Sequence, residues 1–309
     1  MSSNPCLKKH RSSLYHLSSK YTPSVTSNIF AAEISGETRG SIWSEMCQVG
    51  EKLVNDYAWA VPDSRALKVI KHFGDMTGGV IEVGCGKNCY WGKLLNEMGV
   101  NVKCYDIDAD AGGTIGKDGD KLKGGGKEKK RKAEDSSSSS SSKKEFKTLV
   151  GGPEVLLQKS NHNKTLFLCF PDEDFQADSP EVSLGQACLT NFKGKYVVHV
   201  GELFGNTISS EQAPFGRSSS EFFQMKLHTE YHCILKIALP TWPHAAESLS
   251  VWKLSKTCPI TFAADEDVED DEEETVEYYD IPEDEKLPVD VAAKCCEGLL
   301  AELEQFKGR

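Results

Sequence analysis

One short stretch of this chain constrains its fold more than any other. The apolar run Val80–Val83 predicts a buried strand, and Gly84 and Gly86 follow it at the spacing of a tight turn. Apolar residues at helical spacing come next, then a second strand at Asn101–Tyr105, which ends at Asp106. A strand, glycine loop, helix, strand and acid in this order predict an α/β fold that binds a nucleotide-like ligand. An ordinary strand–turn–helix with an incidental acid is the alternative.

The loop itself distinguishes between ligand classes. A dinucleotide-binding loop has a third glycine three positions after the second, and Cys89 stands there in this chain. An acidic residue, Glu82, lies near the end of the strand before the first glycine. The spacing therefore disfavours a nicotinamide dinucleotide.

The pattern Glu82-x-Gly84-x-Gly86-x-Asn88 resembles motif I of class I S-adenosylmethionine-dependent methyltransferases. The resemblance implies that Glu82 binds toward the methionine amino group and that Asp106 binds the ribose hydroxyls. Asn88 stands where the family usually has glycine, which is tolerable because asparagine also reaches left-handed conformations. The Tyr-x-Trp-Ala-x-Pro segment at 57–62 resembles a subgroup of the same superfamily.

Further predicted elements extend the resemblance over about residues 60–256. Helices are expected from near Ile42 and from Asp63 or Ser64 to Gly74. The remaining strands are expected at 146–150, 165–172, 196–202, 231–239 and 249–254. The last two form a terminal hairpin similar to the one that carries the antiparallel seventh strand of methyltransferases. The predicted fold class is therefore α/β, a doubly wound, mostly parallel sheet with a terminal antiparallel strand hairpin.

The resemblance also assigns candidate site residues. Asp172 and Glu202, at the ends of the fourth and fifth predicted strands, are the candidate catalytic acids. No metal site is expected, and His228 and His232 are interpreted as structural or exposed. The candidate residues for binding S-adenosylmethionine are Glu82, Gly84, Cys85, Gly86, Asn88, Tyr90, Asp106 and Gly152.

Polar segments divide the chain. Residues 1–36 are predicted to be a disordered tail, with an organelle transit peptide as the alternative. A methyltransferase-like domain spans 37–263 and is interrupted by a low-complexity insertion at 109–147. An acidic disordered segment, 264–287, then leads to an amphipathic helix at 288–309, which either packs on the core or binds a partner.

The net charge of −11 belongs to one segment, since residues 265–285 hold 14 acids and no base. The eleven cysteines form no Cys-x-x-Cys pair, which is typical of a reduced intracellular protein. No apolar run reaches membrane-spanning length. The expected location is thus cytoplasmic or nuclear. A short basic run at 129–132 leaves a nucleic-acid contact or nuclear import signal open.

Three functions follow from these features. The first is an S-adenosylmethionine-dependent methyltransferase whose acceptor the sequence does not name. The second is a protein of the same fold that binds or scaffolds without turnover, with a protein partner held through the acidic segment and the last helix. The third is an NAD(P)-dependent oxidoreductase, which Cys89 argues against.

Overall fold

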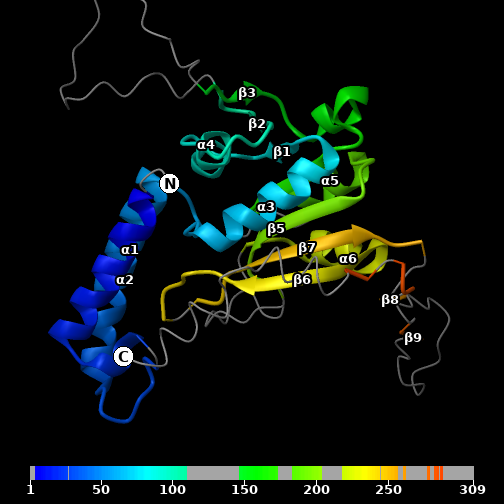
Figure 1. Cartoon of the computed structure of the whole chain (residues 1–309). Coiled ribbons are helices and arrows are strands. Elements are labelled where there is room, and N and C mark those ends of the chain that lie inside the picture. The colour runs from blue at the N-terminus through cyan, green and yellow to red at the C-terminus, as the bar shows by residue number, and fades with distance from the viewer. Residues whose placement is uncertain are drawn as a thin grey trace, which may run out of the picture.

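The computed structural model describes residues 4–26, 28–109, 146–172, 183–203, 218–243, 245–256, 260–261, 277–278, 282–284 and 286–287. Seven strands form one sheet in the order β3-β2-β1-β4-β5-β7-β6 (Figure 1). They are β1 (Val80–Val83), β2 (Val102–Asp106), β3 (Leu149–Val150), β4 (Thr165–Cys169), β5 (Tyr196–Gly201), β6 (Tyr231–Ala238) and β7 (Ser248–Leu254). A separate pair joins β8 (Ile260–Thr261) to β9 (Glu277–Tyr278).

The sheet is parallel from β3 to β5, and β7 alone runs against its two neighbours. The β6–β7 pair is the terminal hairpin that the sequence predicts. Tyr105 pairs with Leu149 across β2 and β3, so the chain on both sides of the 109–147 insertion belongs to one sheet. Residues 110–145 of that insertion lie outside the described residues.

Helices cover both faces of the sheet. The helices α3 (Ser64–Thr77) and α4 (Tyr90–Glu97) pack with β5 and β7 side chains in one apolar cluster. On the other face lie α5 (Leu184–Asn191), α6 (Glu221–Glu230) and the short 3-10 turn η3 (Pro153–Leu157), followed by η4 (Lys159–Asn161). This is the three-layer arrangement in which a parallel sheet is buried on both faces.

Helix α3 shows how the sequence sets local structure. The Asp63 carboxylate caps it by accepting from the Ala66 amide at 2.8 Å. The helix continues past the expected stop at Gly74 and ends at Gly78, whose φ of 77° provides a left-handed C-cap. Gly74 serves packing instead, since a Cβ there would lie 2.6 Å from a Val80 methyl group.

The prediction of a disordered N-terminal tail at residues 1–36 is wrong for the part that the structure describes. Helix α1 (Pro5–Lys20) and the turn η1 (Pro23–Thr26) precede α2 (Gly36–Asp56), and the two helices lie side by side (Figure 1). Serine-rich composition suggested disorder, but a few apolar residues at the right spacing bury a small core. That core contains Leu17, Val25, Ile29, Ile34, Ile42 and Met46.

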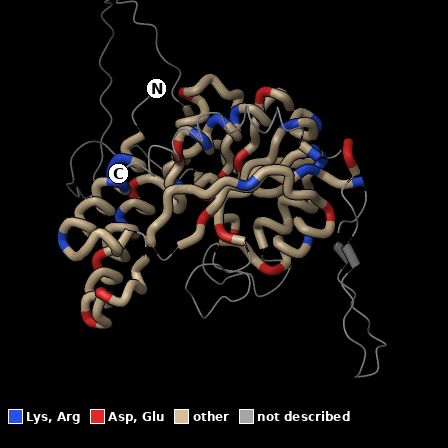
Figure 2. The backbone as a smooth tube through the Cα atoms, turned by 60° about the horizontal axis from the view of Figure 1, so that its bottom comes forward, with Lys and Arg blue, Asp and Glu red and all other residues tan. Residues whose placement is uncertain are grey.

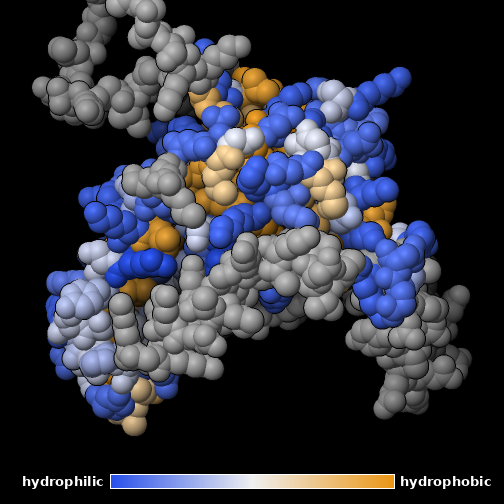
Figure 3. Space-filling model, viewed as in Figure 1, coloured by the Kyte–Doolittle hydropathy of each residue, from blue (hydrophilic) through white to orange (hydrophobic). Residues whose placement is uncertain are grey.

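The surface of the described chain is mixed in character. Acidic and basic residues are interspersed along it (Figure 2), and on the face shown in Figure 3 apolar residues emerge between hydrophilic ones. No helix within the described ranges is long and apolar enough to cross a membrane. Most of the 264–287 segment and all of the predicted 288–309 helix fall outside the described residues.

Candidate functional site

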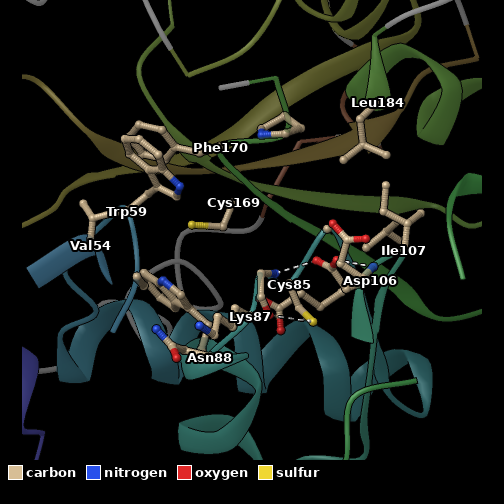
Figure 4. A pocket seen from close by; sticks show the side chains of 18 of the residues that line it. Val54, Trp59, Cys85, Lys87, Asn88, Asp106, Ile107, Cys169, Phe170 and Leu184 are labelled. Atoms are coloured by element: carbon tan, nitrogen blue, oxygen red, sulfur yellow. Dashed lines mark hydrogen bonds between the residues drawn. The ribbon is translucent and has the colours of Figure 1, made fainter. Parts of the chain in front are cut away.

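A cavity of about 580 Å³ opens where β1, β2 and β4 end at their carboxyl edge (Figure 4). From β1 the chain order runs one way to β2 and β3 and the other way to β4 and β5, so this edge is a topological switch point. Ligands of open α/β sheets bind at such points. The volume also lies in the range of small-molecule sites.

The glycine loop forms one wall of this cavity. Gly84 and Gly86 have φ values of 72° and 69°, which a residue with a Cβ adopts only with strain. A Cβ on Gly84 would also lie 2.8 Å from Leu184 Cδ2. The sequence prediction that these two glycines form a tight loop is confirmed, and the loop backbone is open to a ligand.

Asp106 ends β2 beside the loop and lines the cavity. Its Oδ2 accepts from the Gly86 amide at 2.8 Å and its Oδ1 from the Asp108 amide at 3.0 Å. These two bonds fix the carboxylate, and each oxygen retains acceptor capacity toward a ligand. Gly152 lies just after β3, the strand next to β2, and lines the same cavity.

Glu82 is buried at the floor of the cavity, only 2% exposed. The Cys104 thiol donates to its Oε2 at 3.0 Å, and the Cys89 sulfur lies 4.0 Å from the same oxygen. Burial raises the pKa of the Glu82 carboxyl well above its usual value.

The same three side chains are a potential metal ligand set. One ligand atom from each of Glu82, Cys89 and Cys104 lies within 4.8 Å of the others, and all three residues are buried. Two sulfurs and one oxygen suit zinc or another thiophilic ion. Cys85, a third cysteine near the loop, lines the cavity, and its thiol lies 3.7 Å from the Gly86 carbonyl.

Asn88, a predicted cofactor residue, is placed differently from expectation. The left-handed position after the loop is Cys89, with φ of 43°, and not Asn88. Asn88 lines the cavity, and its amide donates to the Asn55 carbonyl at 2.8 Å, which ties the loop to the end of α2. At position 88, asparagine therefore contributes a side-chain hydrogen-bond donor and not a left-handed backbone conformation.

Tyr90 is not among the residues that line the cavity. Its hydroxyl donates to Asn4 Oδ1 at 2.9 Å and accepts from the Cys6 amide at 3.3 Å. Burial raises the pKa of Tyr90 to about 12. In this structure the Tyr90 side chain anchors α1, and its contact with a cofactor stays a prediction.

Asp172 lines the cavity, and both of its carboxylate oxygens take part in local structure. Its carboxylate accepts from the Ser183 hydroxyl (3.0 Å), the Gly185 amide (3.2 Å) and the Ser220 amide (3.0 Å). Ser183 and Ser220 are the N-caps of α5 and α6. A carboxylate at two helix N-termini interacts favourably with both helix dipoles and holds the two helices together.

Glu202 follows β5 and is 1% exposed. It lines a second cavity, of about 430 Å³, rather than the first. The two cavities adjoin, since Val54, Asn55, Trp59 and Phe170 line both. The two predicted catalytic acids, Asp172 and Glu202, thus line different cavities.

Sequence reasoning missed several residues that shape the site. Val54 and Asn55 come from α2, and Phe170 takes a left-handed φ of 51° directly after β4. Phe170 stacks on Trp59 with ring centroids 5.8 Å apart (Figure 4). A strained aromatic residue has no local sequence signal, but such strain is concentrated at functional sites.

The two histidines excluded as metal ligands have structural neighbours. His228 lies on α6 and meets Trp252 edge-on at 4.6 Å, while His232, on β6, shares a 2.7 Å hydrogen bond with the Ser255 hydroxyl. Their structural interpretation agrees with these contacts.

Comparison with known proteins adds little to the geometry. No family model and no curated protein matches the chain. One solved structure, from work described as "Conversion of a Disulfide Bond into a Thioacetal Group during Echinomycin Biosynthesis", is 12% identical. It superposes with a TM-score of 0.30 over 57% of this chain and 75% of that chain, a likeness too low to bear on function.

Proposed function

We propose that this chain is an S-adenosylmethionine-dependent methyltransferase. The observation that carries the proposal is the pairing of Asp106 with the Gly84–Gly86 loop at the switch point of a sheet whose β7 is antiparallel. The strand order β3-β2-β1-β4-β5-β7-β6, with only β7 reversed, supports this family over a dinucleotide oxidoreductase, which does not need the terminal hairpin.

The residues present fit such a ligand. Asp106 and the loop amides would hold the ribose, and Gly152 leaves room for the adenine beside β3. Glu82 would meet the methionine amino group, because an ammonium ion beside a buried carboxylate favours its charged form and offsets the cost of burying it. When bound, S-adenosylmethionine would supply a methyl group, which bonds to an acceptor lone pair as the carbon–sulfur electron pair stays on sulfur.

The chain's own contribution to such a reaction is positioning. Donor and acceptor must be held in line at near-contact distance while water is excluded. Trp59, Phe170 and Val54 border both cavities, so they would surround the junction between donor and acceptor. Asp172 would hold the end of β4 against α5 and α6 and would not act as a base, because its carboxylate accepts hydrogen bonds from the N-terminal ends of those helices.

Asp172 also gives the second candidate function its support. A methyltransferase fold whose strand-four acid binds two helix N-termini could bind S-adenosylmethionine without turnover. Methyl transfer from radiolabelled donor to a cell extract separates an enzyme from a binding protein. A binding-competent chain that labels nothing favours the second candidate.

Calorimetry tests the proposal directly. S-Adenosylmethionine and S-adenosylhomocysteine are expected to bind, and NAD is not. Asp106→Ala should weaken binding by at least about tenfold, since a charge-assisted hydrogen bond contributes roughly 1.5–3 kcal/mol. Asp75→Ala, at the exposed end of α3, is the matched control and should leave affinity unchanged. Failure of both sulfur compounds to bind would overturn the proposal.

A further inference from the structure

A cluster of two cysteines and one glutamate lies behind the floor of the first cavity. It joins three elements, since Glu82 is in β1, Cys104 is in β2 and Cys89 directly precedes α4. Of the three, only Glu82 lines the cavity. Cys89 and Cys104 lie 7 and 22 residues from Glu82, so the fold and not a local motif brings them together. The described ranges contain no second group of three His, Cys, Asp or Glu ligand atoms at this spacing.

The cluster buries a carboxyl group that has no cationic partner. Each of its three residues is at most 2% exposed. The hydrogen bonds to Glu82 come from neutral donors, the Cys104 thiol and the Gly92 amide. Within the described ranges, no Lys, Arg or His side chain pairs with this carboxyl. A buried carboxylate is costly unless it is compensated, and a cation bound between the three ligand atoms would compensate it.

A glycine keeps the centre of the cluster clear of side chains. Gly92 lies inside α4, although glycine is a poor helix former. A Cβ at this position would lie 2.2 Å from the Cys104 sulfur and 2.9 Å from the Cys89 sulfur. It would also lie 2.9 Å from Glu82 Oε2. The three candidate ligand atoms thus surround one point, which any residue other than glycine would fill.

We propose that Glu82, Cys89 and Cys104 bind a thiophilic divalent cation, for which Zn²⁺ suits the set best. Zinc accepts sulfur and carboxylate ligands together, whereas Mg²⁺ and Ca²⁺ prefer sites made only of oxygens. Both thiols lose their protons to water when the ion binds, so they coordinate it as thiolates. Three protein ligands leave the fourth position of a tetrahedral ion to a small ligand such as water.

Such an ion would tie β1, β2 and the start of α4 together at the base of the glycine loop. Cys89 is the residue with the left-handed φ of 43°, and coordination would hold it in that conformation. The inference is independent of methyl transfer, because it concerns the sulfurs behind the cavity and its test uses the metal alone.

Cobalt(II) is the probe, because sulfur-to-cobalt charge transfer gives an absorption band that grows with the number of bound thiolates. The reduced full-length chain is freed of metal with a chelator and titrated with Co²⁺. We expect one tightly bound ion per chain, with a band from two thiolates that Zn²⁺ removes. Cys89→Ser and Cys104→Ser should each show about half of this band and bind at least about tenfold more weakly.

Three further variants complete the test, each checked for folding by circular dichroism. Glu82→Gln keeps both thiols and nearly the same side-chain shape, so it should retain the band but bind Co²⁺ at least about tenfold more weakly. Cys47→Ser, which removes an exposed thiol from α2, is the matched control and should change nothing. The double variant Cys295→Ser, Cys296→Ser removes two adjacent cysteines outside the described residues and should also change nothing.

A parent protein without the charge-transfer band would overturn the inference. A full band in both Cys89→Ser and Cys104→Ser, or its loss in the double variant alone, would place the ion elsewhere and overturn it too. If a serine variant does not fold, alkylation of the parent protein decides the question. Zn²⁺ should slow modification of Cys89 and Cys104, mapped by peptide mass spectrometry, and leave that of Cys47 unchanged. Equal rates with and without Zn²⁺ would contradict the site.

Discussion

At the scale of single residues, buried histidines set the response of this protein to acid. His199 lies in β5 with no exposed surface, and its ring packs on Phe223 at 5.2 Å. Neither ring nitrogen has a hydrogen-bond partner among the described residues. Burial lowers the pKa of His199 to about 3, and burial likewise lowers those of His10 and His228 to about 4. All three are therefore neutral in the folded protein.

This predicts a loss of stability as pH falls below about 6.5. The folded pKa of His199 lies below the unfolded value, so the unfolded chain takes up the proton first. Stability is complete above about pH 6.5 and falls as the pH drops toward the folded pKa. His199 alone should cost about 2 kcal/mol between pH 7 and pH 5.

The measurement is urea unfolding at pH 7 and pH 5. His199→Leu should lose about 2 kcal/mol less than the parent protein over that range. His16→Leu removes an exposed histidine and is the control. Identical pH losses for parent and His199→Leu would show that His199 does not titrate on unfolding.

At the scale of elements, one side chain links α1 to the sheet domain. Asn4 Oδ1 caps α1 by accepting from the Leu7 amide and also accepts from the Tyr90 hydroxyl. Its amide nitrogen donates to the Pro62 carbonyl at 2.6 Å. One residue thus holds the first helix, the loop before α3 and the start of α4 together.

Asn4→Ala should therefore loosen α1 from the domain. Loss of the cap alone costs about 1 kcal/mol, and the two tertiary bonds are lost with it. Hydrogen exchange of the amides in Pro5–Lys20 should become faster, while exchange in β4 and β5 stays unchanged. Ser13→Ala, which removes an exposed hydroxyl from the same helix, is the control. Equal protection of α1 in both variants would contradict this role.

The elements that sequence could predict are those whose signal is local. Val80–Val83 forms β1 with all four residues buried, because a β-branched run between glycines has few alternatives. The terminal hairpin lies within one residue of its predicted bounds. Helix α1 was missed because its order comes from packing on α2, which a serine-rich composition hides.

The site divides in the same way. Gly84, Gly86 and Asp106 reach the cavity as predicted, since backbone geometry and strand ends place them. Tyr90 and Asp172 differ because their partners are remote: Asn4 is 86 residues from Tyr90, and Ser220 is 48 residues from Asp172. A motif specifies a residue's position in the chain, but distant neighbours decide where its side chain points.

At the scale of the whole molecule, the cavity joins two parts of the fold. The loop and strand ends come from the sheet domain, whereas Val54 and Asn55 come from the N-terminal helix pair. The Asn88 amide bonds across this junction to the Asn55 carbonyl. A ligand in the cavity should therefore order both parts together, and not the glycine loop alone.

Hydrogen exchange with and without saturating S-adenosylhomocysteine tests this coupling. A ligand present at a hundred times its dissociation constant stabilises the bound state by about 2.7 kcal/mol, enough to slow exchange clearly. Protection should rise in residues 50–60 as well as 84–90, because both line the cavity. The β6–β7 hairpin should be least affected near Tyr231 and Leu254, since neither residue lines the cavity. At tenfold lower affinity, the Asp106→Ala variant retains only about 1.4 kcal/mol of this stabilisation at the same ligand concentration, so both regions should show weaker protection. Protection confined to 84–90 would mean that the helix pair does not take part in binding.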